Sequence, residues 1–257
     1  PLEEELGEGK PHLVAYLREL MPGEGPDHGI PAVVVYPGGG YKHLSPREAD
    51  PIAMEFAGRG YHVFILYYSL DPRRYPAPLL GGAKALYLIR EHAQKWHVDP
   101  DRIAVCGFSA GGHAAALLSC LWNDPVIAQA GLSNEKAKPN AAILGYPVIT
   151  SVKGSCHEGS FQCLLGEEAE GPMRQAMALE TRVNDQNPPT FLWHTATDQA
   201  VPVVSSLWMA QALVDHKIPV ELHIFPEGPH GLSLANRRTS AGGEMKERPE
   251  VEQWMEL

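Results

Sequence analysis

The sequence is poor in the features that mark membrane proteins and nucleic-acid-binding proteins. Its apolar runs fall well short of the ~18 residues of a membrane-spanning helix, so we expect no membrane partner. Lys and Arg total 21 against 31 Asp and Glu, which gives a formal net charge of −10. This shortage of positive charge disfavours binding to nucleic acid and leaves no basic patch for a membrane surface.

Cysteine is also scarce, with four residues in the whole chain. Cys106 and Cys120 fall in apolar segments and are interpreted as small core residues. Cys156 and Cys163 are close in sequence and could form a disulfide or stay free. Neither a C-x-x-C nor an H-E-x-x-H pattern occurs, so we predict no metal site.

The first residues carry no recognisable targeting signal. They are acidic, Pro-Leu-Glu-Glu-Glu, and lack the basic and apolar regions of a signal peptide, which favours a cytoplasmic protein. Because the chain starts with Pro1 and not with Met, a removed signal and secretion stay open. A length of 257 residues with 44% hydrophobic content predicts one domain with a large core, spanning residues 1–257. Nothing in the sequence indicates an oligomeric state.

A Gly-Phe-Ser-Ala-Gly-Gly-His run at residues 107–113 is the most informative stretch of the chain. It follows an apolar segment, residues 102–106, that predicts a strand, and it precedes an Ala- and Leu-rich segment that predicts a helix. In this context G-x-S-x-G is typical of a nucleophile elbow, a strained turn that exposes a serine, here Ser109. Gly107 and Gly111 would relieve crowding against adjacent backbone. The alternative is an ordinary Gly/Ser turn between a strand and a helix.

A serine nucleophile needs a base and an acid, which follow in the order Ser, Asp or Glu, His in folds of this kind. Asp198 comes after residues 189–195, an apolar run that predicts a buried strand. His230 comes after residues 220–225, which alternate like a half-exposed strand. In open α/β sheets ligands bind at the carboxyl ends of the strands, where all three loops would lie. His230 would then accept the proton of Ser109, and Asp198 would orient the imidazole.

Both partners have alternatives. Asp198 could cap a helix that starts near Val201 and Pro202. Asp185 and Asp215 are other acids in the region, and Asp215 lies inside a helical pattern. His230 competes with eleven other histidines. Chain order and placement after a strand favour Asp198 and His230.

Three consecutive glycines follow a β-branched run, residues 32–36, that predicts a central strand. Glycine lets the backbone approach a substrate closely and turn its N–H groups inward. We predict an oxyanion hole formed by the N–H groups of Gly39, Gly40 and Ala110. A flexible linker or a phosphate-binding loop are the alternatives, but the G-x-G-x-x-G spacing of the latter is not matched.

The remaining segments alternate between predicted strands and helices, which favours a mostly parallel sheet with helices on both faces. Further strands are predicted at residues 61–67 and 141–148, and helices at residues 48–57, 79–96, 202–216 and 249–257.

One stretch interrupts this alternation. Residues 151–187 separate two predicted strands by far more than a connection needs, and we expect a lid or substrate wall with small helices near residues 160–166 and 173–179. The alternative is a surface excursion away from the substrate. Tyr41, Lys42 and His43, just after the glycines, are candidates for the substrate pocket.

Taken together, residues 36–41, 107–113, 188–195 and 225–234 resemble the α/β-hydrolase superfamily. More narrowly they resemble its bacterial acetyl-xylan-esterase-like branch of sugar and lipase-like esterases. In that branch two consecutive acids follow the Trp-His-Thr strand, and the second is catalytic. The resemblance therefore implies the same role for Asp198, with Thr197 in the place of the first acid.

The leading hypothesis is a cofactor-independent serine esterase that acts on a small-molecule ester. The resemblance implies short acyl esters of sugars or xylo-oligosaccharides. A peptidase or amidase with the same triad is the second hypothesis. A non-catalytic binding protein on a hydrolase scaffold is the third, although such proteins commonly lose the nucleophile or the histidine.

Overall fold

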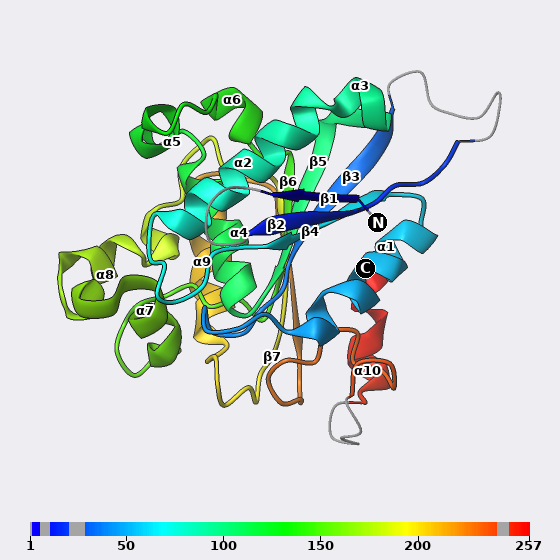
Figure 1. The fold of residues 1–257 in the computed structure, drawn as a ribbon. Coiled ribbons are helices and arrows are strands. Elements are labelled where there is room, and N and C mark those ends of the chain that lie inside the picture. The colour runs from blue at the N-terminus through cyan, green and yellow to red at the C-terminus, as the bar shows by residue number, and fades with distance from the viewer. Residues whose placement is uncertain (1, 6–10, 21–28, 241–246) are drawn as a thin grey trace.

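The structure is a computed structural model that describes residues 2–5, 11–20, 29–240 and 247–257 (Figure 1). Its centre is an eight-stranded sheet with the strand order β1-β2-β4-β3-β5-β6-β7-β8. Strands β3 to β8 run parallel to one another, and β1 and β2 pair antiparallel at one edge. The strands are β1 Leu2–Glu5, β2 His12–Tyr16, β3 Ile30–Tyr36, β4 His62–Tyr67, β5 Val98–Phe108, β6 Ala141–Gly145, β7 Thr190–Thr195 and β8 Val220–Phe225.

Helices cover both faces of this sheet. Figure 1 shows α1 and α10 on one side, and α2, α4 and α9 on the other. The main helices are α1 Asp50–Gly58, α2 Ala77–Glu91, α3 Ala93–Trp96, α4 Ala110–Leu121, α5 Pro125–Gln129, α6 Asn134–Ala137, α7 Glu158–Leu165, α8 Pro172–Ala176, α9 Val204–Asp215 and α10 Pro249–Glu252, and short 3₁₀ turns occur at Pro46–Glu48, Gly166–Glu170, Leu179–Thr181 and Gln253–Met255.

The position of β3 between two layers of helices explains why its sequence is continuously apolar. Successive side chains of a strand point to opposite faces, so a strand between two helical layers is buried on both. Val33 and Val35 belong to the apolar cluster that includes Phe56 of α1. Val34 and Tyr36 belong to the larger cluster on the side of α2 and α4. The prediction of an α/β-hydrolase fold with a mostly parallel sheet is confirmed.

The predicted strands are all present, and the differences concern the ends of elements. The strand expected at residues 141–148 stops at Gly145, because Tyr146 has a positive φ of 36° that extended backbone does not allow. The helix expected at residues 79–96 is two helices, α2 and α3, separated at His92. The helix expected at residues 48–57 begins only at Asp50, after a 3₁₀ turn.

Strands β1 and β2 are missing from the sequence-based prediction. Three consecutive glutamates have little intrinsic preference for a strand, so pairing with β2 overrides the local sequence in β1. Strand β2 shows a regular alternation of buried and half-buried residues, as expected for an element near the sheet edge.

The topology brings four loops together. Strands β3, β5, β7 and β8 point the same way, so the loops that leave them open at one edge of the sheet. These loops carry Gly39, Ser109, Asp198 and His230 respectively.

Candidate active site

Ser109 occupies the turn between β5 and α4 in a backbone conformation that L-residues rarely adopt, with φ 54° and ψ −122°. Hydrogen bonds hold it there. Its N–H donates to the carbonyl of Gly145 at 3.1 Å, and its own carbonyl accepts from Val148 at 3.0 Å and from His113 at 3.1 Å. Strain of this kind persists only where the surroundings over-determine it, and it is typical of functional sites.

The two glycines of the motif are required by close backbone contacts. A Cβ on Gly107 would lie 2.3 Å from the carbonyl oxygen of Gly111. A Cβ on Gly111 would lie 2.1 Å from the carbonyl oxygen of Tyr36, on the neighbouring strand β3. The elbow therefore needs glycine at both positions, as the steric argument from the sequence predicts.

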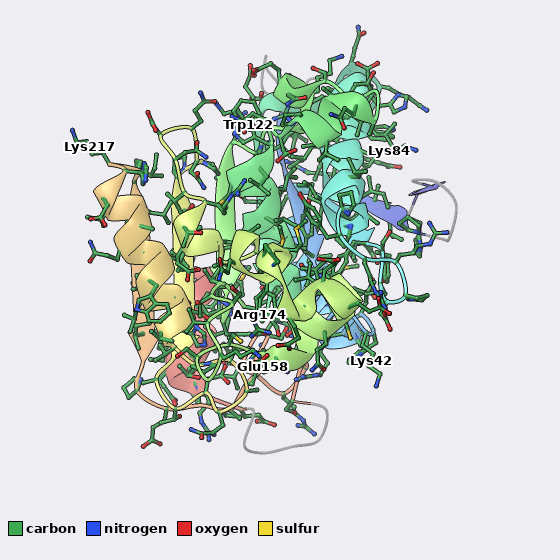
Figure 2. The ribbon with its side chains drawn as sticks, turned by 90° about the vertical axis from the view of Figure 1, so that its left-hand side faces the viewer. Lys42, Lys84, Trp122, Glu158, Arg174 and Lys217 are labelled. Carbon is green, nitrogen blue, oxygen red and sulfur yellow. The ribbon has the colours of Figure 1, made fainter. Side chains whose placement is uncertain are left out.

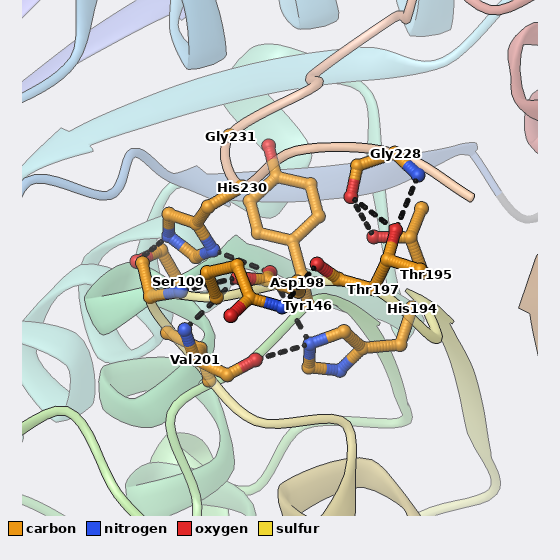
Figure 3. A network of polar contacts seen from close by, with 12 residues as sticks. Ser109, Tyr146, His194, Thr195, Thr197, Asp198, Val201, Gly228, His230 and Gly231 are labelled. Carbon is orange, nitrogen blue, oxygen red and sulfur yellow. Dashed lines mark hydrogen bonds and ion pairs between the residues drawn. The ribbon is translucent and has the colours of Figure 1, made fainter.

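His230 connects Ser109 to Asp198 (Figure 3). Its Nε2 lies 2.8 Å from the hydroxyl oxygen of Ser109, and its Nδ1 lies 2.7 Å from Oδ2 of Asp198. Of the candidate residues from the sequence, the structure thus brings these three into one hydrogen-bonded chain. The other acids lie elsewhere: the side chain of Asp185 is 93% exposed and faces His216 at 3.9 Å.

Asp198 has a completely buried side chain, and both carboxylate oxygens are engaged. Oδ1 accepts from the N–H groups of Ala200 at 2.9 Å and Val201 at 3.0 Å, and Oδ2 faces His230 and His194. Burial by itself would raise the pKa of Asp198, but hydrogen bonds from His194, His230 and Val201 outweigh it and hold the pKa well below its usual value. The carboxyl is therefore a stable anion. Asp198 therefore accepts from the N–H groups at the start of the following turn, as the capping alternative expects, and contacts His230 at the same time.

Thr197 ties the loop of Asp198 to the loop of His230. The Thr197 hydroxyl donates to the carbonyl of Gly228 at 3.3 Å and accepts from the Gly228 N–H at 3.0 Å. Thr195 donates to the same carbonyl at 2.8 Å. A threonine in place of the first acid thus provides a neutral link between the two loops.

The glycine loop presents free backbone N–H groups at the same edge. Within the described residues, no hydrogen bond engages the N–H groups of Gly39, Gly40 or Ala110. The carbonyl of Gly39 points the other way and accepts from Lys42 at 3.1 Å and His43 at 3.2 Å. Ala110 is the first residue of α4, where N–H groups are unpaired and the helix dipole is positive. This arrangement can stabilise a developing oxyanion.

Glu48 is a buried carboxylate that the sequence-based prediction missed. It is 2% exposed, and it accepts from the N–H of Gly38 at 2.8 Å and from the hydroxyl of Tyr146 at 2.6 Å. The same hydroxyl accepts from the N–H of Ser233 at 2.8 Å. The Tyr146 ring packs edge-on against His230, with centroids 5.1 Å apart. Glu48 therefore joins the glycine loop to the histidine loop. The sequence gave no signal for this role, because Glu48 is the first residue of the helix predicted at residues 48–57, where a charged side chain is expected to be exposed.

A cavity of about 530 Å³ opens above these groups. Among the residues that the structure describes, no Leu, Ile, Val, Phe, Tyr, Trp or Met side chain lines it, and the lining includes hydroxyl, imidazole, amide and charged groups. The lining residues are Gly39, Gly40, Lys42, His43, Ser45, Arg47, Glu48, Ser109, His157, Gly159, Gln162, Cys163, His230 and Gly231.

Of the three pocket candidates from the sequence, Lys42 and His43 line this cavity and Tyr41 does not. Tyr41 is 1% exposed and lies in the core, where its hydroxyl contacts Nδ1 of His113 at 2.8 Å and its ring packs against Tyr68. The prediction that Tyr41 lines the pocket is therefore wrong.

Residues 151–187 contribute one wall of the cavity. His157, Gly159, Gln162 and Cys163, in and before α7, line it, whereas α8 does not. Burial, and then the neighbouring His230, lower the pKa of His157. Sequence reasoning missed His157, because a histidine before a short helix is common in loops.

A buried arginine holds this segment together. Arg174 donates through Nε to the carbonyl of Ser151 at 2.8 Å and pairs with Glu158 at 2.7 Å. Nη2 also contacts the sulfur of Cys156 at 3.1 Å. Figure 2 shows Arg174 and Glu158 at the same end of the molecule as Lys42. Cys156 and Cys163 are both free thiols, so the possible disulfide does not form.

Two further results concern other kinds of site. Among the described residues, no cluster of three or more His, Cys, Asp or Glu side chains is placed to hold a metal ion. In the same part of the chain, no helix has both the length and the apolar character to cross a bilayer.

Comparison with known proteins gives a consistent picture. The BD-FAE family profile matches residues 20–213. The endo-1,4-beta-xylanase B of Butyrivibrio fibrisolvens is 34% identical over 90% of this chain, and the acetylxylan esterase of Xylanibacter ruminicola is 27% identical over 88%. These matches span 36% and 45% of the two relatives, so the chain covers less than half of either. Among solved structures, the acetyl ester-xyloside bifunctional hydrolase of Caldicellulosiruptor lactoaceticus is 36% identical with a TM-score of 0.81, covering 98% of this chain and 86% of that one.

Proposed function

The chain belongs to the BD-FAE family, and from this premise we propose that it is a serine carboxylic-ester hydrolase whose site is the cavity above Ser109. The observation that carries the proposal is the hydrogen-bonded chain from Ser109 through His230 to Asp198, with distances of 2.8 and 2.7 Å. The names of its relatives, which include an acetylxylan esterase, support ester chemistry over peptide hydrolysis.

In the proposed mechanism, Nε2 of His230 accepts the proton of Ser109 as its oxygen attacks the ester carbonyl. Asp198 keeps the other ring nitrogen protonated and stabilises the imidazolium. The N–H groups of Gly39, Gly40 and Ala110 bind the carbonyl oxygen as it becomes negative.

The attack gives a tetrahedral intermediate. Its collapse breaks the bond to the alcohol, which takes its proton from His230. An acyl group then remains on Ser109. A water molecule attacks it, with His230 again acting as the base, and the acid leaves. Each proton is returned, so the cycle needs no metal and no cofactor.

We propose short acyl esters of sugars or xylo-oligosaccharides as the substrates. The hydroxyl, imidazole, amide and charged groups of the lining suit a hydroxyl-rich alcohol, and within the described residues no large apolar side chain lines a channel for a long acyl chain. The His157 side of residues 151–187 would form the wall that contacts the substrate.

A fluorophosphonate probe together with an ester panel tests the proposal. The probe should label Ser109, and Ser109→Ala should lose the label and nearly all turnover of a short acyl ester. Ser133→Ala, at an exposed serine before α6 that does not line the cavity, serves as the control that keeps both. Labelling of another serine, or full turnover by Ser109→Ala, would refute the mechanism.

A further inference from the structure

Asp198 is held by a complete set of donors, and one of them has no place in the proposed mechanism. A carboxylate offers about four acceptor positions. Two are filled by the N–H groups of Ala200 and Val201, and a third by His230. The fourth faces Nε2 of His194, 3.4 Å from Oδ2. Because the Asp198 side chain is fully buried, solvent does not reach this oxygen.

His194 itself is oriented by contacts on both ring nitrogens. It lies in β7 and is fully buried. Nδ1 lies 2.8 Å from the hydroxyl oxygen of Ser206 in α9, and Nε2 lies 3.0 Å from the carbonyl oxygen of Val201. A carbonyl can only accept, so Nε2 carries the hydrogen and Nδ1 of the neutral ring accepts from Ser206. The same Nε2 lies 3.4 Å from Oδ2 of Asp198, so its hydrogen is placed between the Val201 carbonyl and the carboxylate, and this contact helps to lower the pKa of Asp198 (Figure 3).

We propose that His194 is a positioning residue for Asp198, and that the Val201 carbonyl and the Ser206 hydroxyl together hold its ring with the Nε2–H beside the carboxylate. The inference rests on the proposed function, since it assigns a partner to the acid of the same site. The functional chain then runs from Ser206 through His194, Asp198 and His230 to Ser109. It links helix α9 to the elbow of β5 across the sheet edge.

The contact with His194 has a defined electrostatic effect. Two donors share Oδ2, so each receives part of its negative charge. Without His194 the charge is concentrated on the bond to His230, which favours the imidazolium and keeps the base protonated to higher pH. The carboxylate also loses a contact that fixes its rotation. Both effects act on kcat. The lining of the cavity does not include His194, so KM is spared.

Other titratable groups face this chain and must be held constant. His157, at the start of α7, lies close enough to His230 to interact with it electrostatically. The Tyr146 ring packs against His230 from the other side, with its hydroxyl on Glu48. None of these residues contacts His194 or Ser206, so substitutions at the latter two positions leave them in place.

The chain contains a matched control. Ser205 and Ser206 are adjacent in α9 and both are fully buried, but the hydroxyl of Ser205 has no hydrogen-bond partner. Ser206→Ala removes the contact to His194. Ser205→Ala removes an equal hydroxyl that has no hydrogen-bond partner among the described residues. At His194 itself, Gln keeps an N–H near the position of Nε2, and Leu keeps the volume without a donor.

The experiment compares kcat, KM and the pH profile of a short acyl ester for these variants. We expect His194→Leu to lower kcat about tenfold at unchanged KM and to move the acid limb of kcat/KM to higher pH by about half a unit. His194→Gln should stay within about threefold of wild type, with no shift of the limb. Ser206→Ala should lose about threefold in kcat, and Ser205→Ala should match wild type.

Nitrogen-15 spectra of the imidazoles provide a readout that needs no turnover. They should show His194 as the Nε2–H tautomer in wild type and in Ser205→Ala, and a changed Nδ1 shift in Ser206→Ala, where this nitrogen loses its donor. Equal losses in Ser205→Ala and Ser206→Ala, equal losses in the Gln and Leu variants, a limb that does not move upward, or an Nδ1–H tautomer in wild type would each overturn the proposal. A wild-type protein that neither turns over esters nor reacts with the fluorophosphonate would instead refute the proposed function, and the spectra would still test the contact.

Discussion

A Cβ on Gly39 would lie 2.1 Å from the carbonyl oxygen of His43. The loop folds back so tightly, with φ 130° at Gly39, that no side chain fits. The neighbouring glycine differs. At Gly40 the nearest atom to an added Cβ is Cε1 of His157, at an ordinary contact distance of 3.7 Å. The three consecutive glycines therefore serve different purposes.

Substitutions at Gly39 and Gly40 should have different effects on kcat. Gly39→Ala must displace the backbone of His43 or of the loop, which moves the proposed oxyanion donors, and we expect kcat to fall on the order of 100-fold. Gly40→Ala has room for its methyl group and only the strain of a positive φ of 67°, about 1 kcal/mol of stability, so kcat should fall less than tenfold. Steady-state kinetics and thermal unfolding measure both effects. Equal kinetics in the two variants would contradict this distinction.

The acid of the site can be tested with a substitution that preserves its shape. Asp198→Asn should lower kcat by roughly 10³- to 10⁴-fold, because an amide can donate to His230 and favour the wrong tautomer. The fold should persist, since asparagine still accepts from the N–H groups of Ala200 and Val201. Asp185→Asn is the control, at an exposed position, and should keep full activity. The opposite pattern would transfer the role of the acid to Asp185.

His113 should make the protein sensitive to mild acid. It is fully buried between Tyr41 and the carbonyl of Met177, and burial lowers its pKa to about 4. In the unfolded chain it titrates near ~6.5, so between these values the unfolded state binds the extra proton. Stability is then fully present above pH ~6.5 and falls as the pH drops toward 4, by about 2 kcal/mol at pH 5.

Denaturant unfolding at pH 7.5 and pH 5 measures this effect. The free energy of unfolding should differ less between the two pH values in His113→Gln than in wild type, by about 2 kcal/mol. The absolute stability of this variant should be lower at both pH values. His216→Gln, at a half-exposed position, should keep the wild-type difference. An undiminished difference in His113→Gln would assign the acid sensitivity to other groups.

The walls of the cavity predict the acyl-chain dependence. Acetyl esters should be hydrolysed fastest, with kcat/KM falling at least tenfold by octanoyl, because no large apolar side chain of the described residues lines the cavity. Amides of the same acids should react far more slowly, since an amine is the poorer leaving group. Incubation with a chelator should leave the rates unchanged. A preference for octanoyl esters, or loss of activity with the chelator, would contradict the proposed substrate class.

Much of this architecture is determined by local sequence. The fold class follows from alternating apolar strands and helices. Ser109, Asp198 and His230 can be selected because each follows a strand, and parallel strands bring their carboxyl ends to one edge. The steric need for Gly107 and Gly111 is likewise contained in the motif.

What only the tertiary structure decided depends on contacts between distant segments. Glu48 reaches Tyr146 across 98 positions. His194 and Asp198 are near in sequence, but His194 also reaches Ser206 of α9, so its orientation depends on how that helix packs. Tyr41 is buried whereas Lys42 lines the cavity, a difference that composition does not encode. Burial creates these roles. A carboxylate or imidazole removed from water must find partners, and only the folded chain determines which ones lie within reach.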